Sequence, residues 1–269
     1  MDRREALRAG ALVAAGAAVG RWSRQPEPPL DAVAATDRGF AGTRAGSGSA
    51  ASTQVIWQVS TDEPVLALTF DDGPVPSYTQ DYLDMLRDRD VQATFNLVGR
   101  NALDHPELVR REIADRHQVE NHSWSHLDLA TATAAQTDHE LARGADVLES
   151  LTGRAPRYFR PPRGNLSGAT LNAAARAGED VLLWSVQLHE SRLDVDANIA
   201  HVLARVQPGT ILLAHDTHHG TIDRRIGLRA LPVIIDRLRD RGFRFVTVDE
   251  LVTAGPALPP PAGGPLASR

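Results

Sequence analysis

The chain has 269 residues, 42% of them hydrophobic, and a formal net charge of −5, which suits one domain of about 200 residues with additional terminal segments. The mildly acidic balance and the lack of a basic cluster argue against nucleic acid as a partner. The sequence contains no cysteine and no lysine, which excludes disulfides, thiolate metal sites, cysteine nucleophiles, and Schiff-base or phosphate-loop lysines.

The first residues have the order of an export signal. Arg3 and Arg4 form a twin-arginine pair, and residues 9–20 are an alanine- and glycine-rich apolar run that is too short to span a bilayer. A basic N-terminal arm is the alternative. We predict a twin-arginine signal in residues 1–34, with residues 32–34 as a candidate cleavage site. The protein is then expected outside the cell or at its surface, with no stable membrane span after export.

The composition divides the remainder into three parts. Residues 35–53 are rich in glycine, alanine and serine without periodicity, which predicts a flexible linker. Residues 54–254 have the regular hydrophobic patterns of a folded catalytic domain. Residues 255–269 are rich in proline, glycine and alanine and are expected to form a disordered tail.

Strand and helix patterns alternate through the central part. Apolar runs predict strands at residues 65–68, 91–98 and 119–122, up to residue 160, and at 181–184, 211–213 and 243–248. Helical patterns lie between them, at 79–88 with Thr79 as the cap, from Pro106 onward, from Leu141 to Gly153, and at 169–177, 199–206 and 231–238. This alternation predicts a parallel sheet covered by helices, and about seven units favour a closed or distorted barrel in one α/β domain.

Polar residues fall where predicted strands end. Asp71 and Asp72 follow the first strand, and Gly73-Pro74 then breaks the backbone. Two adjacent carboxylates beside an apolar run are expected to differ in role, one bound to a cation and the other moving protons. A solvated Asp-Gly turn would have the same sequence. Because strand ends converge on one face of a parallel barrel, polar residues at the other strand ends favour a shared site there.

His122 and His126 are four residues apart, the spacing that places two imidazoles on one side of a helical turn. With Asp72 they make a His2Asp set that leaves coordination positions for water and substrate. The spacing by itself also suits a structural or surface pair. Without sulfur ligands we expect one divalent metal, zinc first, with cobalt, nickel and manganese as alternatives.

Arg160 lies in the stiff turn Arg160-Pro161-Pro162-Arg163-Gly164, where a fixed guanidinium can orient a carboxylate. An ordinary salt bridge is the alternative. His215 ends the run Leu213-Ala214-His215-Asp216 and can serve as a general acid, although a histidine there can also be a packed loop residue.

Together these motifs resemble the polysaccharide deacetylase family, the carbohydrate esterases of family 4 with the NodB homology domain. The resemblance covers about residues 65–252 and includes Thr69-Phe70-Asp71-Asp72-Gly73-Pro74, Ala93-Thr94-Phe95, His122-Ser123-Trp124-Ser125-His126, Arg160-Pro161-Pro162-Arg163-Gly164, Trp184-Ser185-Val186, Leu212-Leu213-Ala214-His215-Asp216 and Phe245-Val246-Thr247-Val248. It implies a distorted (β/α)7 barrel and metal-dependent removal of acetyl groups from N-acetylated or O-acetylated glycans.

The resemblance also implies roles for matching positions. The catalytic roles are a general base, a positive charge that orients it, and an acid for the leaving amine: Asp71, Arg160 and His215. The metal ligands are Asp72, His122 and His126. The backbone N–H of Arg163 would stabilise the oxyanion, while Trp184 and Leu213 would line the pocket for the acetyl methyl group.

Some positions depart from the family pattern. Gln187 stands where an Asp is usual, Glu190-Ser191 replaces the usual Asp-Trp pair, Arg163 replaces a common aromatic residue, and Asn96 replaces a common Phe. A neutral amide at residue 187 would leave His215 without the usual charge. We predict that Gln187→Asp moves the alkaline limb of activity upward in pH, unless a nearby carboxylate already compensates, for which the candidates are Glu190, Asp194 and Asp216.

The sequence therefore predicts a secreted, monomeric deacetylase of amino-sugar polymers, with peptidoglycan or chitin oligomers preferred over acetylated xylan. An acetylxylan esterase of the same family is an alternative. A catalytically weakened glycan-binding protein is a second, motivated by the altered region at Gln187. Amidohydrolase chemistry on a small molecule is a third.

Overall fold

The computed structural model describes residues 52–217 and 225–261 of the chain. The predicted export signal and most of the predicted linker lie outside the described residues. Within them, no helix combines the length and apolar character that crossing a bilayer requires.

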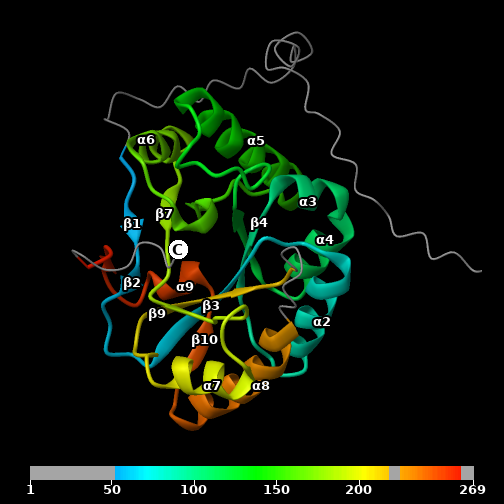
Figure 1. The fold of residues 1–269 in the computed structure, drawn as a ribbon, viewed down its shortest axis with the longest axis vertical. Coiled ribbons are helices and arrows are strands. Elements are labelled where there is room, and N and C mark those ends of the chain that lie inside the picture. The colour runs from blue at the N-terminus through cyan, green and yellow to red at the C-terminus, as the bar shows by residue number, and fades with distance from the viewer. Residues whose placement is uncertain (1–51, 218–224, 262–269) are drawn as a thin grey trace, which may run out of the picture. The chain divides into compact units, whose positions relative to one another are not determined.

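One sheet of nine strands organises the described domain (Figure 1). All pairings in it are parallel. The strands follow the order β1 (Val55–Ile56), β7 (Asp180–Leu182), β6 (Tyr158–Phe159), β5 (Gln118–Asn121), β4 (Thr94–Leu97), β3 (Val65–Asp71), β9 (Thr210–His215) and β8 (Val186–Gln187), with β10 (Arg244–Val246) also beside β3. Since β1 and β8 end the path without pairing to each other within the described chain, the sheet is the predicted distorted, incompletely closed barrel.

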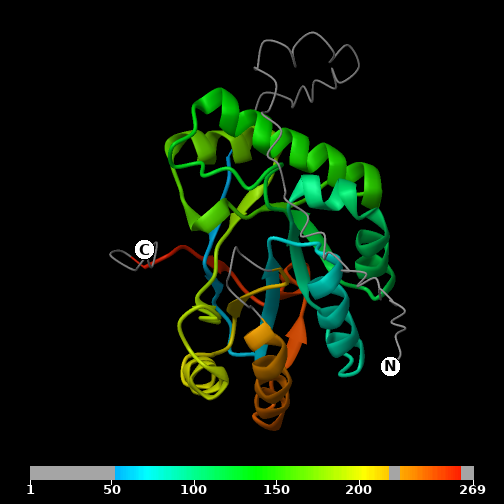
Figure 2. The ribbon, with the colours of Figure 1, turned by 45° about the vertical axis from the view of Figure 1, so that its right-hand side comes forward.

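Helices surround this sheet. Figures 1 and 2 show α5 (Ala134–Thr152) with α6 (Gly168–Ala177) at one end of the domain and α7 (Val195–Leu203) with α8 (Arg225–Asp240) at the other. The remaining helical segments are α2 (Pro76–Arg87), α3 (Gly99–Asp104), α4 (Pro106–Ala114), η1 (Pro162–Gly164) and α9 (Val248–Leu251). The sequence had predicted the strand and helix alternation that gives this α/β architecture.

The alternation of side chains along β3 determines where its polar end points. Leu66, Leu68 and Phe70 belong to the core formed with the surrounding helices, including residues of α2 and α8. Val65 and Ala67 belong to a second core on the other face, with Tyr158, Leu182 and Ile211 as neighbours. Because successive side chains of a strand alternate between faces, this second face is also the one that Thr69 and Asp71 share.

Two predicted elements begin or end at other residues, and one helix was not predicted. The first helix starts at Pro76 rather than after a Thr79 cap, because proline is well suited to the first turn; the Thr79 hydroxyl instead accepts from the N–H of Val75 at 2.7 Å. Helix α3 was not predicted. The strand expected at 243–248 ends at Val246, since Thr247 forms a capping box with Glu250 at the start of α9.

The predicted disordered tail also needs correction. Residues Ala257–Leu258 form β11, which pairs in antiparallel fashion with β2 (Gln58–Val59). The N–H of Trp57 donates to the carbonyl of Leu258 at 2.7 Å. Backbone hydrogen bonds to an available strand edge order this segment despite its proline-rich composition. Residues 262–269 lie outside the described residues.

Candidate active site

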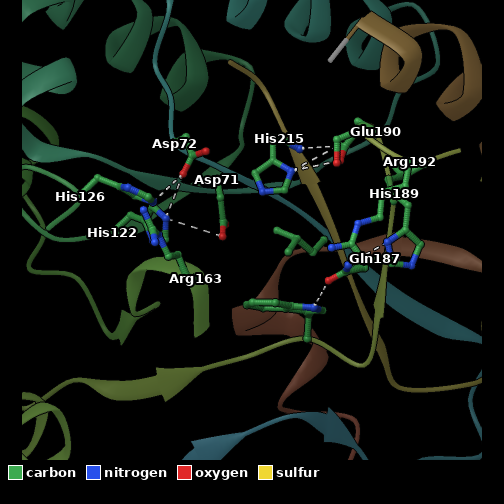
Figure 3. Close-up of a pocket in the computed structure, with 14 residues that line it drawn as sticks. Asp71, Asp72, His122, His126, Arg163, Gln187, His189, Glu190, Arg192 and His215 are labelled. Carbon is green, nitrogen blue, oxygen red and sulfur yellow. Dashed lines mark hydrogen bonds and ion pairs between the residues drawn. The ribbon is translucent and has the colours of Figure 1, made fainter. Parts of the chain in front are cut away.

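A pocket of about 280 Å³ lies at the C-terminal ends of the central strands, and it brings together most of the predicted site residues (Figure 3). Those that line it are Asp71, Asp72, His122, His126, Arg163, Trp184, Leu213 and His215. Arg160 is fully buried and contacts the pocket through Asp71. Residues from positions 71 to 215 thus converge because parallel strands end at the same face.

Asp72, His122 and His126 form a compact group of metal-ligand type. The Nε2 atoms of His122 and His126 lie 3.2 and 3.1 Å from Oδ1 of Asp72. A tetrahedral metal with ligands at about 2.0–2.1 Å separates its ligand atoms by about 3.3 Å, so these spacings fit a metal. The Nδ1 of His122 donates to the Arg160 carbonyl at 2.7 Å, which leaves Nε2 as the coordinating atom once the ring is neutral.

The loop that carries the two histidines differs from the predicted helical turn. Residues 122–126 are not helical, and Ser123 and His126 have left-handed backbones with φ of 67° and 60°. The Asn121 side chain accepts from the N–H of Ser123, and the Ser123 hydroxyl accepts from the N–H of His126, both at 3.0 Å. These side-chain hydrogen bonds hold a loop that brings both imidazoles to Asp72.

In the absence of a metal, the charges around Asp72 and His122 determine the protonation of these two side chains. Burial alone would raise the pKa of Asp72, yet hydrogen bonds from His122 and His126, with His215 nearby, bring that pKa well below its ordinary value. Burial alone would lower the pKa of His122, but Asp71 and Asp72 outweigh it and raise that pKa. Because a metal ligand must be deprotonated, protons and metal compete for this site.

Two side chains, those of Arg160 and Asn96, hold the carboxylate of Asp71. Its Oδ1 accepts from Nη1 of Arg160 at 2.8 Å and from Nδ2 of Asn96 at 2.7 Å. Nη1 of Arg160 also donates to the Thr69 hydroxyl at 2.7 Å. The rest of the guanidinium donates to the carbonyls of Leu182 and Leu183, so its position is fixed. The buried carboxylate therefore has its charge balanced and one oxygen, Oδ2, turned toward His122 at 3.8 Å.

His215 lies on the other side of the pocket and is paired with Glu190. Its Nδ1 is 3.3 Å from both carboxylate oxygens, and its backbone N–H donates to Oε1 at 3.2 Å. Glu190 is 5% exposed. Gln187 does not fill this role: its Oε1 accepts from Nε1 of Trp184 at 2.8 Å, and its amide nitrogen contacts Nδ1 of His189 at 3.1 Å. Of the three carboxylates considered from the sequence, Glu190 is the one that contacts His215.

The three predicted substrate-binding residues line the same pocket. Arg163 has a left-handed backbone with φ of 61°, and its exposed side chain pairs with Asp128 at 3.3 Å. The Trp184 ring lies so close to Gly164 that a Cβ there would be 2.8 Å from it, which explains the glycine. Leu213 is buried and forms part of the pocket wall.

Sequence reasoning missed two contacts at or next to the pocket. Asn96 was noted only as a departure, although its place opposite Asp71 in the β3–β4 register brings its amide to the carboxylate. Asp216 was considered only as a partner for His215, and its contact with Thr79 was not foreseen: Asp216 is fully buried and accepts from the Thr79 hydroxyl at 2.5 Å, while its Oδ1 has no hydrogen-bond partner among the described residues. Burial and the repulsion of Asp72 and Asp71 raise the pKa of Asp216 to about 7, despite the Thr79 hydrogen bond.

Comparison with known proteins gives a consistent result. The polysaccharide deacetylase family model matches residues 58–182. A peptidoglycan-N-acetylglucosamine deacetylase of Bacillus cereus is 34% identical over 203 residues, which cover 74% of this chain and 92% of the relative. A chitooligosaccharide deacetylase of a Bradyrhizobium species is 36% identical over 194 residues, with 68% and 89% covered. Among solved structures, the Bc1960 peptidoglycan N-acetylglucosamine deacetylase superposes with a TM-score of 0.68 at 32% identity, covering 72% of this chain and 91% of that one.

Proposed function

The chain belongs to the polysaccharide deacetylase family and is a glycan deacetylase, and we propose that it is an exported, metal-dependent enzyme. Its proposed substrates are N-acetylated glycans of the peptidoglycan or chitin type. One observation carries the proposal. The His2Asp group lies in the same pocket as a second carboxylate, Asp71, whose charge is balanced by a buried arginine. Such a pair separates metal binding from proton transfer between two adjacent residues.

The metal would be held by Asp72, His122 and His126. When bound, a divalent metal would supply Lewis-acid chemistry, polarising the acetyl carbonyl and making water more acidic. Zinc suits the nitrogen and oxygen ligands, and cobalt, nickel and manganese remain alternatives.

The chain's own groups would move the protons. Asp71 would accept a proton from the attacking water at its Oδ2, since Oδ1 is occupied by Arg160 and Asn96. His215 would donate a proton to the leaving nitrogen, with Glu190 orienting its ring through Nδ1. The backbone N–H of Arg163, in the turn beside the metal ligands, would donate to the developing oxyanion.

The presence of an acid favours an amide over an ester as substrate. Without protonation, the nitrogen would have to leave as an amide anion, which is a much stronger base than the alkoxide released from an ester. A general acid beside the leaving group therefore matters more for N-acetyl groups than for O-acetyl groups. The buried contact between Glu190 and His215 supports such an acid. Acetylxylan esterase activity is therefore the second choice. A weakened glycan-binding protein is less well supported, because the base and the ligand group lie together.

The test is acetate release by the metal-loaded full chain from N-acetylglucosamine oligomers and from acetylxylan, before and after chelation. We expect release from the oligomers that chelation stops and added zinc restores. Release from neither substrate, with tight glycan binding, would favour the binding protein instead.

Export and oligomeric state need their own measurements. Replacing Arg3 and Arg4 with lysine should keep the protein inside the producing cell if the twin-arginine interpretation is right. Light scattering of the purified chain should give the mass of a monomer.

A further inference from the structure

The guanidinium groups of two arginines at the pocket take no part in the chemistry proposed above. Arg163 follows β6, on the side of the metal ligands, and Arg192 lies in the loop between β8 and α7, on the side of His189 and Glu190 (Figure 3). Both side chains are exposed. The chain as a whole has a net charge of −5, so a cationic rim here is a local feature and not a reflection of composition.

The carboxylates of the pocket already have partners inside it. Asp71 pairs with Arg160 at 2.8 Å, and Asp72 lies within 3.2 Å of two imidazoles. Glu190 pairs with His215. These three carboxylates therefore already have roles in the proposed mechanism, as the general base, as a metal ligand and as the partner of His215. A bound divalent metal would add further positive charge.

The guanidinium of Arg163 already binds a carboxylate within the protein. It pairs with the carboxylate of Asp128 at 3.3 Å, with 61% of the arginine side chain exposed. Asp128 does not depend on this contact, because Asn165 donates to it at 2.9 Å and the N–H of Ala130 at 3.1 Å. An exposed ion pair contributes little, so an incoming carboxylate can replace Asp128 at little cost.

The opposite wall carries the guanidinium of Arg192. His189 packs against His201 with ring centroids 4.6 Å apart. Burial lowers the pKa of His189, and the charges of Arg192 and Arg205 lower it further, although Glu190 opposes them. The positive charge of this wall therefore comes from Arg192, with the carboxylate of Glu190 beside it.

The pocket offers fewer groups suited to binding a neutral sugar than groups suited to binding a carboxylate. Among the described residues that line the pocket, Trp184 is the one indole or phenyl side chain, and it is held against Gly164 and hydrogen-bonded to Gln187. Ring faces on which a pyranose could stack are therefore scarce at this pocket.

We propose that Arg163 and Arg192 bind a carboxylate of the substrate, so that the enzyme selects glycans carrying a carboxylate close to the N-acetylated sugar over neutral amino-sugar polymers. The inference rests on the proposed deacetylase function and narrows its substrate class. Guanidinium groups bind carboxylates through paired hydrogen bonds, which gives direction as well as charge. The carboxylate can belong to the neighbouring sugar, as in the lactyl ether of muramic acid, or to a peptide attached to that sugar.

The test compares substrates that differ in this charge. One is a tetrasaccharide of alternating N-acetylglucosamine and N-acetylmuramic acid with the lactyl carboxylate free, and the second has it capped as a methylamide. A third carries a peptide whose own carboxylates are free, and chitotetraose is the fourth. Acetate release by the metal-loaded full chain gives kcat/KM for each.

We expect kcat/KM to be about tenfold higher for a carboxylate-bearing substrate than for the methylamide at low salt, with the gap closing at about 1 M salt. Whether the free lactyl group or the peptide gives the preference identifies the source of the carboxylate. Arg192→Gln should remove most of this preference. Arg110→Gln, which removes an exposed arginine of α4, should retain it.

Equal kcat/KM for charged and capped substrates in the unchanged protein would overturn the inference, as would an Arg192→Gln variant that keeps the full preference. These results differ from failure of the proposed function. If chitotetraose is deacetylated without any carboxylate preference, only the rim assignment fails; if no substrate releases acetate, the deacetylase proposal itself fails.

Discussion

Two halves of the pocket are held together by different kinds of contact. The metal half, formed by Asp72, His122 and His126, has contacts of 3.1 and 3.2 Å and a 2.7 Å hydrogen bond behind one ligand. The acid half, formed by Glu190 and His215, has side-chain contacts of 3.3 Å.

This difference follows from what each half has to present. A metal needs one lone pair per ligand at a set distance, so residue type and position are both fixed. An imidazole that donates a proton needs only negative charge nearby, which can come from more than one loop position. We therefore expect the acid half to accept a change of residue more readily than the metal half.

The largest effect is expected from His126→Ala, which removes a ligand of the metal half. The variant should lose most of its bound metal and its turnover, because two remaining ligands hold a metal far less firmly than three. Elemental analysis after desalting measures this. His139→Ala, on α5 outside the pocket, should keep its metal. Full metal retention by His126→Ala would remove His126 from the ligand set.

Asp71→Asn separates the base from the ligands. The amide keeps the shape but cannot accept a proton from water, so kcat should fall by about 10²–10⁴ while metal content stays normal. Asp81→Asn, on the exposed face of α2, is the matched control. An unchanged kcat would mean that another group is the base.

Asp216→Asn tests the buried carboxyl group of the residue that follows His215. Its pKa of about 7, against 3.8 ordinarily, means that the folded protein holds this proton more tightly than the unfolded chain. Stability should therefore be lost as pH rises from about 4 through 7, by at most about 4 kcal/mol.

The asparagine variant has no such charge to bury. Urea unfolding of the metal-free proteins should give it the higher free energy of unfolding at pH 8, with the difference shrinking toward pH 4. Parallel pH profiles for the two proteins would contradict the raised pKa.

Glu190→Gln removes the negative charge of the acid half and keeps its size. The protonated imidazole of His215 is then less favoured, so the alkaline limb of kcat/KM should move to lower pH, with about tenfold less activity near pH 8. Glu190→Asp should restore part of it. An unmoved limb would show that His215 does not depend on Glu190.

The smallest effect is expected from Gln187→Asp. Because the Gln187 amide contacts Trp184 and His189 rather than His215, a new carboxylate there should leave the alkaline limb in place. The same pH profile measures it. A shift upward in pH would mean that residue 187 reaches His215 in solution and that the two carboxylates share the role.

The two halves also differed in how well the sequence predicted them. Strand periodicity predicted the sheet, and the motif spacings named Asp72, His122 and His126, because lone-pair geometry restricts which residues can serve. The helical turn expected between the histidines was wrong, since Ser123 and His126 adopt left-handed backbones that spacing alone does not reveal. Glu190 could be named only as one of three candidates, because loop conformation decides which carboxylate reaches the imidazole.

The pairing of β2 with β11 has a consequence for how this domain can be engineered. Val59 of β2 lies opposite Ala257 of β11, so two strands near the two ends of the described domain are neighbours. A short peptide could therefore join these two ends, and new termini could be opened in an exposed loop far from the pocket, since circular permutation succeeds where ends are close and the cut lies at the surface. For the same reason the domain can be placed inside a loop of a carrier protein, with both connections entering side by side.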